Sequence, residues 1–485
     1  MFNPFPVEPA HEVCRTLLSQ VQNGEVRIEL TGKPSGRSEQ GVMLGVLVCK
    51  DKNGNTVVLK TNSGISKKLV LSHGVNDDSI YVPPVVEPSL IEEALSKNDA
   101  KIHELTNQIE SEKKNQNTQT VLRLQKEREA LTTESLLKVF DLYSFCCADG
   151  IKKPLMSICK KLPPTGTGEC CAPKLLHYAF THNLHPVSMC EVFCGTNDSH
   201  GRVHGAVYDP CDERCALLLP AMLGIEILYS DKDIIVVNKA GGLLSVPGRG
   251  PDKQDCVVTR VKRLFPDCIE QPAVHRLDME TSGLMVLAFT KDAHRELNRQ
   301  FENGEVEKTY EALLDGVLAK KGIAPEGTME LYFRLDVDNR PHQIWDEQYG
   351  KKAVTEWHVR GVERFASKDG TARHVTRIQF VPHTGRTHQL RLASADSHGF
   401  GIPIIGDSLY GTVHEGERLY LHATTLQTCY GSCDEFQHYT RVCSLSATVP
   451  SRFSCACQRK ELAGRCVYIG RYTGRICRCF HVLLQ

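Results

Sequence analysis

A short segment ahead of an apolar strand most strongly constrains what this chain can fold into. The segment His275-Arg-Leu-Asp278-Met-Glu-Thr-Ser-Gly283 places one carboxylate between a basic dipeptide and a Thr-Ser-Gly turn. The apolar run Leu284–Phe289 follows at once and predicts a buried strand. We therefore expect Asp278 at a sheet edge, where cations and turn donors keep its carboxylate ionised. The simpler alternative is an aspartate that only caps a turn.

Other polar and aromatic segments accompany this one in a fixed order. They are Ile225–Arg249, Glu307–Leu313 with Lys308-Thr-Tyr310-Glu-Ala, Arg340–Gln343, His383–Arg391 with Gly385-Arg-Thr-His-Gln-Leu-Arg, and Pro403–Gly411. In content, order and spacing they resemble the motifs of the RluA family of pseudouridine synthases. The resemblance covers roughly residues 223–453, just under half of the chain.

The resemblance implies a fold and a set of roles. The expected fold class is α+β, a mixed and mainly antiparallel sheet flanked by helices (the pseudouridine synthase fold), preceded here by a β-rich and helical extension. It implies that Asp278 is the catalytic aspartate, that Tyr310 lies against the target base, and that Arg391 is the two-pronged charge partner of Asp278. Arg276 and Arg386 are expected to bind substrate, the latter by facing a phosphate or bracing its loop.

The chemistry of pseudouridine formation fits these residue types. The bond from ribose to the uracil nitrogen breaks, the base turns, and a carbon–carbon bond forms. An aspartate can act as the nucleophile in this process, and attack at the ribose or at the base both remain open. One carboxylate and its charge partner suffice, so neither a metal nor an organic cofactor is expected. Outside the motif, Tyr310 would more simply be a strand residue with a wet hydroxyl; inside it, stacking on a flipped uracil is favoured.

The chain departs from the family pattern at two places. Lys239-Ala240 stands where family members usually carry Lys-Pro, which puts the rigidity of that loop in doubt. Leu392-Ala393 follows Arg391 where Val-His is usual, which puts substrate affinity in doubt.

Composition limits partners and compartment. Lysine plus arginine equals aspartate plus glutamate at 58 each, which argues against a broad basic RNA-binding face but not against an enzyme that grips one flipped nucleotide. The expected partner is structured RNA, ribosomal or transfer. The apolar runs are too short to span a membrane and no secretory signal is evident, so a cytoplasmic protein is expected. The oligomeric state is not indicated.

The pattern along the chain predicts five segments. Turn residues, helical periodicity and cysteine content divide them as a β-rich domain 1–88, a helical hairpin 89–143, a Cys/His-rich connection 144–222, the catalytic domain 223–453 and a basic, Cys-rich tail 454–485. The tail is expected to be disordered or loosely attached.

Two local structures are also predicted. The runs Gly41–Cys49 and Thr56–Leu59, separated by Asp51–Asn55, indicate two strands joined by a turn. A helix is expected to begin after Thr290, which can cap it.

The 21 cysteines are expected to be reduced and packed as small apolar residues. Two pairs, Cys190-x3-Cys194 and Cys211-x3-Cys215, could supply ligands for zinc, but no Cys-x2-Cys knuckle occurs and no metal ligand set is assigned.

Two further functions remain as alternatives. One is a catalytically inactive RNA-binding or ribosome-assembly protein with the same fold, against which the intact Asp278, Tyr310 and Arg391 argue. The other is a zinc-dependent RNA-binding protein whose catalytic half is secondary.

Overall fold

The computed structural model describes residues 3–31, 41–115, 117–159, 161–196, 201–367, 370, 372–430, 458–462, 465–472 and 475–482. The chain divides into two compact units. Unit 1 is Met1–Asp231 with Arg263–Pro266, and unit 2 is Lys232–Lys262 with Asp267–Gln485. Among the described residues, no helix combines the length and apolar content needed to cross a membrane.

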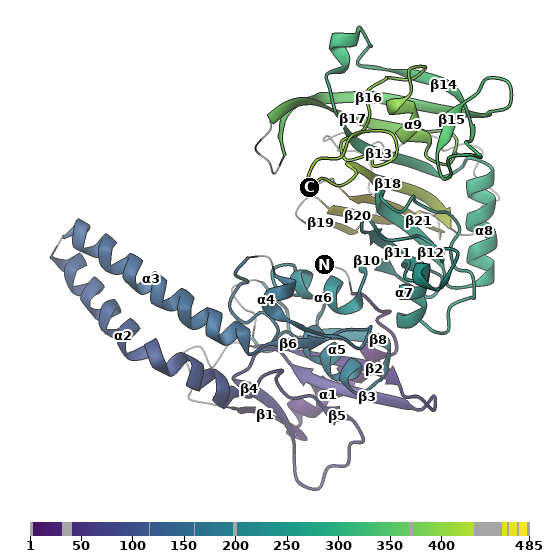
Figure 1. The fold of residues 1–485 in the computed structure, drawn as a ribbon. Helices are drawn as coiled ribbons and strands as arrows, with labels where there is room; N and C mark the ends of the chain where they lie inside the picture. Colours follow the sequence, from purple (N-terminus) through teal and green to yellow (C-terminus); the bar gives the residue numbers. More distant parts are fainter. Residues whose placement is uncertain are drawn as a thin grey trace. The chain divides into compact units, whose positions relative to one another are not determined.

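Unit 1 is built on a five-stranded sheet with the order β5-β3-β2-β8-β9, in which only the β3–β5 pair is parallel (Figure 1). Its strands are β1 Val26–Leu30, β2 Val42–Lys50, β3 Thr56–Asn62, β4 Lys67–Leu71, β5 Ile80–Tyr81, β6 Ser144–Cys146, β7 Lys152–Pro154, β8 His185–Cys194, β9 Val207–Tyr208 and β10 Glu226–Ser230. Its helices are α1 Ala10–Gln22, α2 Pro88–Lys114, α3 Thr118–Asp141, α4 Leu155–Ile158, α5 Cys171–Thr181 and α6 Cys215–Leu223.

The central strand β2 is apolar from Val42 to Cys49 because helices cover both of its faces. Val42, Leu44, Val46 and Val48 face one way, into a core shared with α1. Gly45 faces the other way, where a Cβ atom would lie 2.4 Å from the Cβ atom of Cys171 at the start of α5. The hairpin of β2 and β3 predicted from the sequence is present, with Lys50 opposite Thr56 across the turn.

The sequence-based division separated residues 1–88 from 144–222, whereas the structure combines them in one sheet. β8, from the later segment, pairs with β2 along nearly its whole length. Apolar periodicity identifies a strand but not its partner, so the sequence could not show this pairing. The five-segment division as a whole stays a prediction.

The helices α2 and α3 lie side by side as a hairpin (Figure 1). Leu105, Ile109, Val121 and Leu124 form its small core. Farther from the turn of the hairpin, a buried hydrogen bond of 3.1 Å from the Asn98 side-chain amide to the Ser135 hydroxyl joins the two helices.

Unit 2 contains a large sheet in which the strands β11-β12-β18-β13-β17-β16-β14-β15 follow in that order. All pairs are antiparallel except β12 with β18. Its strands are β11 Ile234–Lys239, β12 Ser282–Ala288, β13 Glu307–Leu314, β14 Glu326–Leu335, β15 Gln343–Trp345, β16 Lys351–Ala366, β17 Ala372–Pro382, β18 Leu421–Tyr430, β19 Gln458–Leu462, β20 Arg465–Tyr472 and β21 Arg475–Val482. Its helices include α8 Lys291–Glu302 and α9 Gln389–Ala395, with short 3-10 turns at Pro251–Lys253 and Leu318–Lys321; α7 spans Val257–Leu264. The α+β class with a mixed, mainly antiparallel sheet is therefore confirmed.

Two local predictions in unit 2 can be compared with the structure. The Thr290 hydroxyl caps α8 by accepting from the backbone of Ala293 at 3.3 Å, as the sequence pattern predicted. Within the predicted tail, β21 pairs antiparallel with Thr425–Tyr430 of β18. This strand is therefore not loosely attached, while the expectation for the whole segment 454–485 stays a prediction. Strand β12 pairs with β18 only at His422 and Ala423. Residues Thr425–Tyr430 of β18 are therefore available to pair with β21.

Candidate active site

The backbone on both sides of Asp278 is held by the loop that follows β11. The Ser245 hydroxyl donates to the carbonyl of Leu277 at 2.6 Å and accepts from its amide at 3.0 Å. The carbonyl of Met279 accepts from the Lys239 ammonium at 2.8 Å and from the Gly242 amide at 2.9 Å. Four hydrogen bonds to Leu277 and Met279 therefore fix the backbone that carries the half-buried Asp278 side chain.

Lys239, the last residue of β11, connects this loop to the segment that carries Asp278. Its side chain is fully buried, and the ammonium donates to the carbonyls of Ala240 and Leu243 as well as to Met279. Burial lowers the pKa of Lys239 to about 8, and the charge of Asp278 opposes that shift. The side chain thus ties both ends of the loop to the segment that carries Asp278.

Glycine allows this loop to come close to Asp278. A Cβ atom on Gly241 would lie 2.9 Å from the carbonyl oxygen of Glu280, and Gly242 has a φ of +86°. Gly241 and Gly242 therefore allow the loop to approach the backbone next to Asp278, although Ala240 replaces the proline that is usual in the family.

A buried ion pair lies within the electrostatic reach of Asp278. Arg391, on α9, donates from Nε and Nη2 to the Asp407 carboxylate at 2.8 and 2.5 Å. Its Nη2 also donates to Glu280 at 2.9 Å, and the Ser408 hydroxyl donates to the other Glu280 oxygen at 2.7 Å. The side chains of Arg391 and Asp407 are 2% and 0% exposed, so the pair is shielded from screening by solvent.

This arrangement differs from the predicted pairing of Arg391. Its two-pronged partner is Asp407, whereas Asp278 acts on it only through its charge among the contacts described. Burial alone would lower the pKa of Arg391, but the hydrogen bond and charge of Asp407, followed by the charges of Glu280 and Asp278, raise it overall. Asp278 thus lies beside a cation whose direct partners are other carboxylates.

Tyr310 lies on β13, between Phe380 of β17 and Ala423 of β18. The pairing with β18 shifts register between Thr309 and Tyr310, a local irregularity of the kind that redirects side chains near functional sites. Burial, and then the charge of Asp278, raise the pKa of the Tyr310 hydroxyl. The Tyr310 hydroxyl is therefore close enough to Asp278 for the charge of the carboxylate to oppose its ionisation. The expected contact of the ring with a target base stays a prediction.

His388 and Tyr410 complete the surroundings of Asp278. His388 has a φ of +54°, a left-handed conformation that is uncommon for a residue with a side chain. Its Nδ1 lies 2.7 Å from the Tyr410 hydroxyl, and the Gln343 amide donates to that hydroxyl at 2.8 Å. Burial lowers the pKa of His388, against the charge of Asp278, and raises the pKa of Tyr410 to about 12. Both side chains are therefore close enough to Asp278 for its charge to affect their ionisation.

The two other predicted arginines are less closely involved. Arg276 is exposed, and among the residues that the structure describes none receives a hydrogen bond or ion pair from its guanidinium. Arg386 donates from Nε to the carbonyl of Lys352 at 2.9 Å, and its amide donates to the side chain of Gln389 at 2.9 Å. Arg386 thus connects its loop to β16, which agrees with a bracing role.

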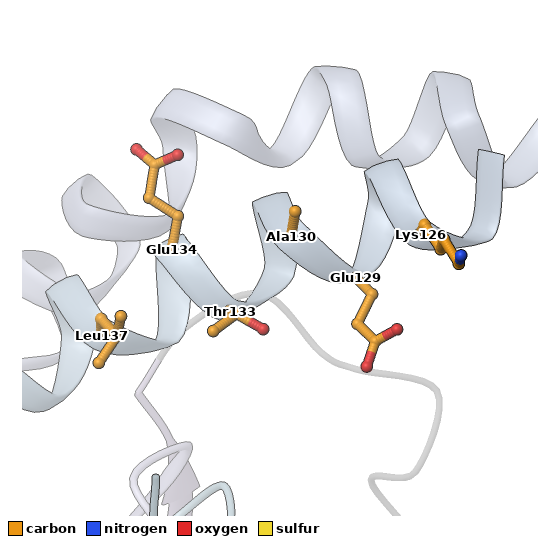
Figure 2. Close-up of a pocket in the computed structure, with 6 residues that line it drawn as sticks. All are labelled: Lys126, Glu129, Ala130, Thr133, Glu134 and Leu137. Atoms are coloured by element: carbon orange, nitrogen blue, oxygen red, sulfur yellow. The ribbon is translucent and has the colours of Figure 1, made fainter. Parts of the chain in front are cut away.

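A shallow pocket elsewhere contains none of these residues. It lies along α3 of unit 1 and is lined by Lys126, Glu129, Ala130, Thr133, Glu134 and Leu137 (Figure 2). None of its lining residues is aromatic, and none belongs to the segments that carry the family resemblance. The site around Asp278 is therefore the better candidate for chemistry.

Comparison with known proteins agrees with the motifs. The family model described as RNA pseudouridylate synthase matches residues 233–396. The chain is 45% identical over 203 residues to the Dual-specificity RNA pseudouridine synthase RluA of Yersinia pestis, covering 41% of this chain and 90% of that protein. The protein of the same name from Escherichia coli (strain K12) is 43% identical over 217 residues, with 44% and 91% covered. The chain belongs to the RluA family of pseudouridine synthases.

Membership of the family makes this chain an RNA pseudouridine synthase, an isomerase. Similarity was also found to two solved human structures, RNA Pseudouridylate Synthase Domain Containing 1 and Domain Containing 4. The first is 28% identical with a TM-score of 0.34, covering 42% of this chain and 78% of that chain. The second is 24% identical with a TM-score of 0.32, covering 43% and 86%.

Several residues of the site were not singled out from the sequence. Lys239, Glu280, His388, Asp407 and Tyr410 all lie inside segments that carried the family resemblance. A charged residue in a segment otherwise expected to be buried, such as Lys239 or Asp407, was the available signal, because buried charges usually have partners.

Proposed function

We propose that this pseudouridine synthase converts defined uridines in ribosomal or transfer RNA, with Asp278 as its nucleophile. The observation that carries the proposal is the fixed position of Asp278, whose two peptide neighbours are held by Ser245, Lys239 and Gly242. A nucleophile held in one geometry lowers the entropic part of the barrier for attack. The names of the bacterial relatives, which include dual specificity, support a substrate range wider than one RNA.

The surroundings of Asp278 suit an isomerisation that needs no added reagent. The bond between the ribose C1′ and uracil N1 breaks, a bond from C1′ to C5 forms, and N1 gains a proton while C5 loses one. A covalent adduct to the Asp278 carboxylate would hold one fragment while the base turns. Arg391 supplies a permanent positive charge nearby, and its own partners keep it in place.

Tyr310 is proposed to stack on the target base. Its ring belongs to a strand in the centre of the sheet, so it offers a rigid surface beside the carboxylate. A base that leaves its helix loses stacking energy, and an aromatic face recovers part of it. Arg276 and Arg386 are proposed to contact the RNA backbone, and a cytoplasmic location stays a prediction.

The proposal is tested by mapping pseudouridine across ribosomal and transfer RNA in cells with and without the gene. Wild type should restore every site lost on deletion, and Asp278→Asn should restore none while still folding and binding RNA. Asp292→Asn is the matched control, since it makes the same change at an exposed position in unit 2. Near wild-type modification by Asp278→Asn would exclude the nucleophilic role. Full modification of both RNA classes in the deletion strain would exclude them as substrates.

A further inference from the structure

Three cysteines of unit 1 come together although the sequence separates them. The Sγ atoms of Cys170, Cys211 and Cys215 all lie within 4.8 Å of one another. Cys170 and Cys211 are 3.7 Å apart, and Cys211 and Cys215 are 3.6 Å apart. Cys215 is buried, whereas the other two are partly accessible to solvent.

These distances match a metal site better than a disulfide. A zinc ion bound to thiolates at about 2.3 Å in a tetrahedron places the sulfur atoms roughly 3.8 Å apart. A disulfide brings two sulfurs to about 2.05 Å and leaves a third without a partner. The distances from Cys211 to Cys170 and to Cys215 therefore match two edges of such a tetrahedron, and the Cys170 and Cys215 sulfurs lie within 4.8 Å of each other.

The backbone around the cluster favours thiolates. Cys170 is the N-cap residue of α5, and Cys215 is the first residue of α6, so two helix N-termini begin at the cluster. The partial positive charge at a helix N-terminus stabilises a thiolate. The Cys215 amide also donates to the sulfur of Cys211 at 3.4 Å. The start of α5 is itself fixed by its close approach to Gly45 of β2.

We propose that Cys170, Cys211 and Cys215 bind one zinc ion, with solvent as the fourth ligand. Thiolates are soft ligands that select zinc among the common divalent ions of the cell. Among the described residues, no other histidine, cysteine or carboxylate joins the group, so the fourth position faces the partly accessible side. The ion joins the segment before α6 to the start of α5, across the forty or so residues of chain that separate them.

The neighbouring candidates from the sequence do not take part. Cys190 lies in the core, where its carbonyl accepts from the thiol of Cys14. Cys194 and His204 are outside the cluster, and Nδ1 of His204 instead accepts from the Gly195 amide at 3.2 Å. Of the two cysteine pairs noted in the sequence, only Cys211 and Cys215 contribute, and Cys170 supplies the third sulfur.

The test is metal analysis of the purified full-length chain, prepared in reducing buffer without chelator. Inductively coupled plasma mass spectrometry should find about one zinc ion per chain in the wild-type protein. Cys211→Ser should lower the zinc content at least tenfold. Cys194→Ser is the matched control, a partly accessible cysteine of the same unit, and should keep its zinc. Cobalt in place of zinc should give the strong near-ultraviolet charge-transfer band of thiolate ligands.

Each other outcome would overturn the proposal. The proposal is wrong if wild type contains no zinc, or if another metal fills the site at full occupancy. It is also wrong if a folded Cys211→Ser variant contains as much zinc as wild type. A non-reduced chain lighter by two hydrogens, with Cys211 linked to Cys170 or Cys215, would identify a disulfide instead. Should Cys211→Ser fail to fold, Cys211→His restores a zinc ligand: zinc in that folded variant supports the site, and its absence refutes it.

Discussion

Replacing Asp407 by Asn tests whether Arg391 is held by Asp407 or by Asp278. The substitution keeps the shape of the side chain and removes its charge. Arg391 then retains Glu280, whose side chain is 25% exposed, as its remaining carboxylate. Oδ1 of Asp407 also accepts from the amides of Leu409 and Tyr410, contacts that the side-chain oxygen of an asparagine can keep.

The magnitude follows from the burial of the pair. Removing one partner of a buried ion pair typically costs about 3–5 kcal/mol, because the other charge stays buried. Since Glu280 still compensates part of the Arg391 charge, we expect the lower end, about 3 kcal/mol. For a unit of this size the melting temperature should fall by about 6–12 °C. If Asp278 were the partner of Arg391 instead, Asp278→Asn would lower the free energy of unfolding by this amount.

The assay is urea unfolding of the full chain followed by tryptophan fluorescence. Both tryptophans, Trp345 and Trp357, belong to unit 2, so the signal reports on that unit alone. Asp292→Asn serves again as the control and should change stability by about 0.5 kcal/mol or less. A loss below about 1 kcal/mol for Asp407→Asn, together with a larger loss for Asp278→Asn, would refute the assigned pairing.

Two further predictions concern residues next to Asp278. Tyr310→Phe should keep most activity, whereas Tyr310→Ala should lower kcat/KM on an RNA stem-loop by about 5- to 150-fold, because stacking contributes roughly 1–3 kcal/mol; equal damage by both would assign the role to the hydroxyl. Lys239 has a folded-state pKa near 8 against 10.5 for the free side chain, so between these values the unfolded chain binds more protons and wild-type stability rises with pH. Relative to Lys239→Met, unfolding should show a gain of about 3 kcal/mol from pH 8 to 10.5, and a constant difference between the two proteins would contradict the lowered pKa.

What the sequence predicted well is what lies close together along the chain. The β2–β3 hairpin follows from two apolar runs joined by a turn rich in Asn and Gly, in which Asp51 accepts from the amides of Asn53 and Asn55. The cap of α8 by Thr290 is likewise local. Asp278 could be predicted from the sequence because all the residues of its motif are contiguous.

What the sequence did not predict depends on contacts between distant segments. The pairing of Arg391 with Asp407 depends on how α9 packs against the loop after it, and several carboxylates in the motifs could have competed for that arginine. Lys239 reaches Met279 only after β11 and β12 have paired. Cys170 meets Cys211 across a span in which the sequence offers several other cysteines.

The pairing of β8 with β2 has a consequence for how unit 1 can be made. β2 leaves the ribosome long before β8, and the whole α2–α3 hairpin is synthesised between them. Until Cys194 has emerged, the apolar β2 has one unpaired edge, a state open to pairing with other chains. A recombinant fragment that stops after the hairpin would keep that edge exposed permanently and should aggregate, so useful truncations of this unit must retain the chain through β8 and β9.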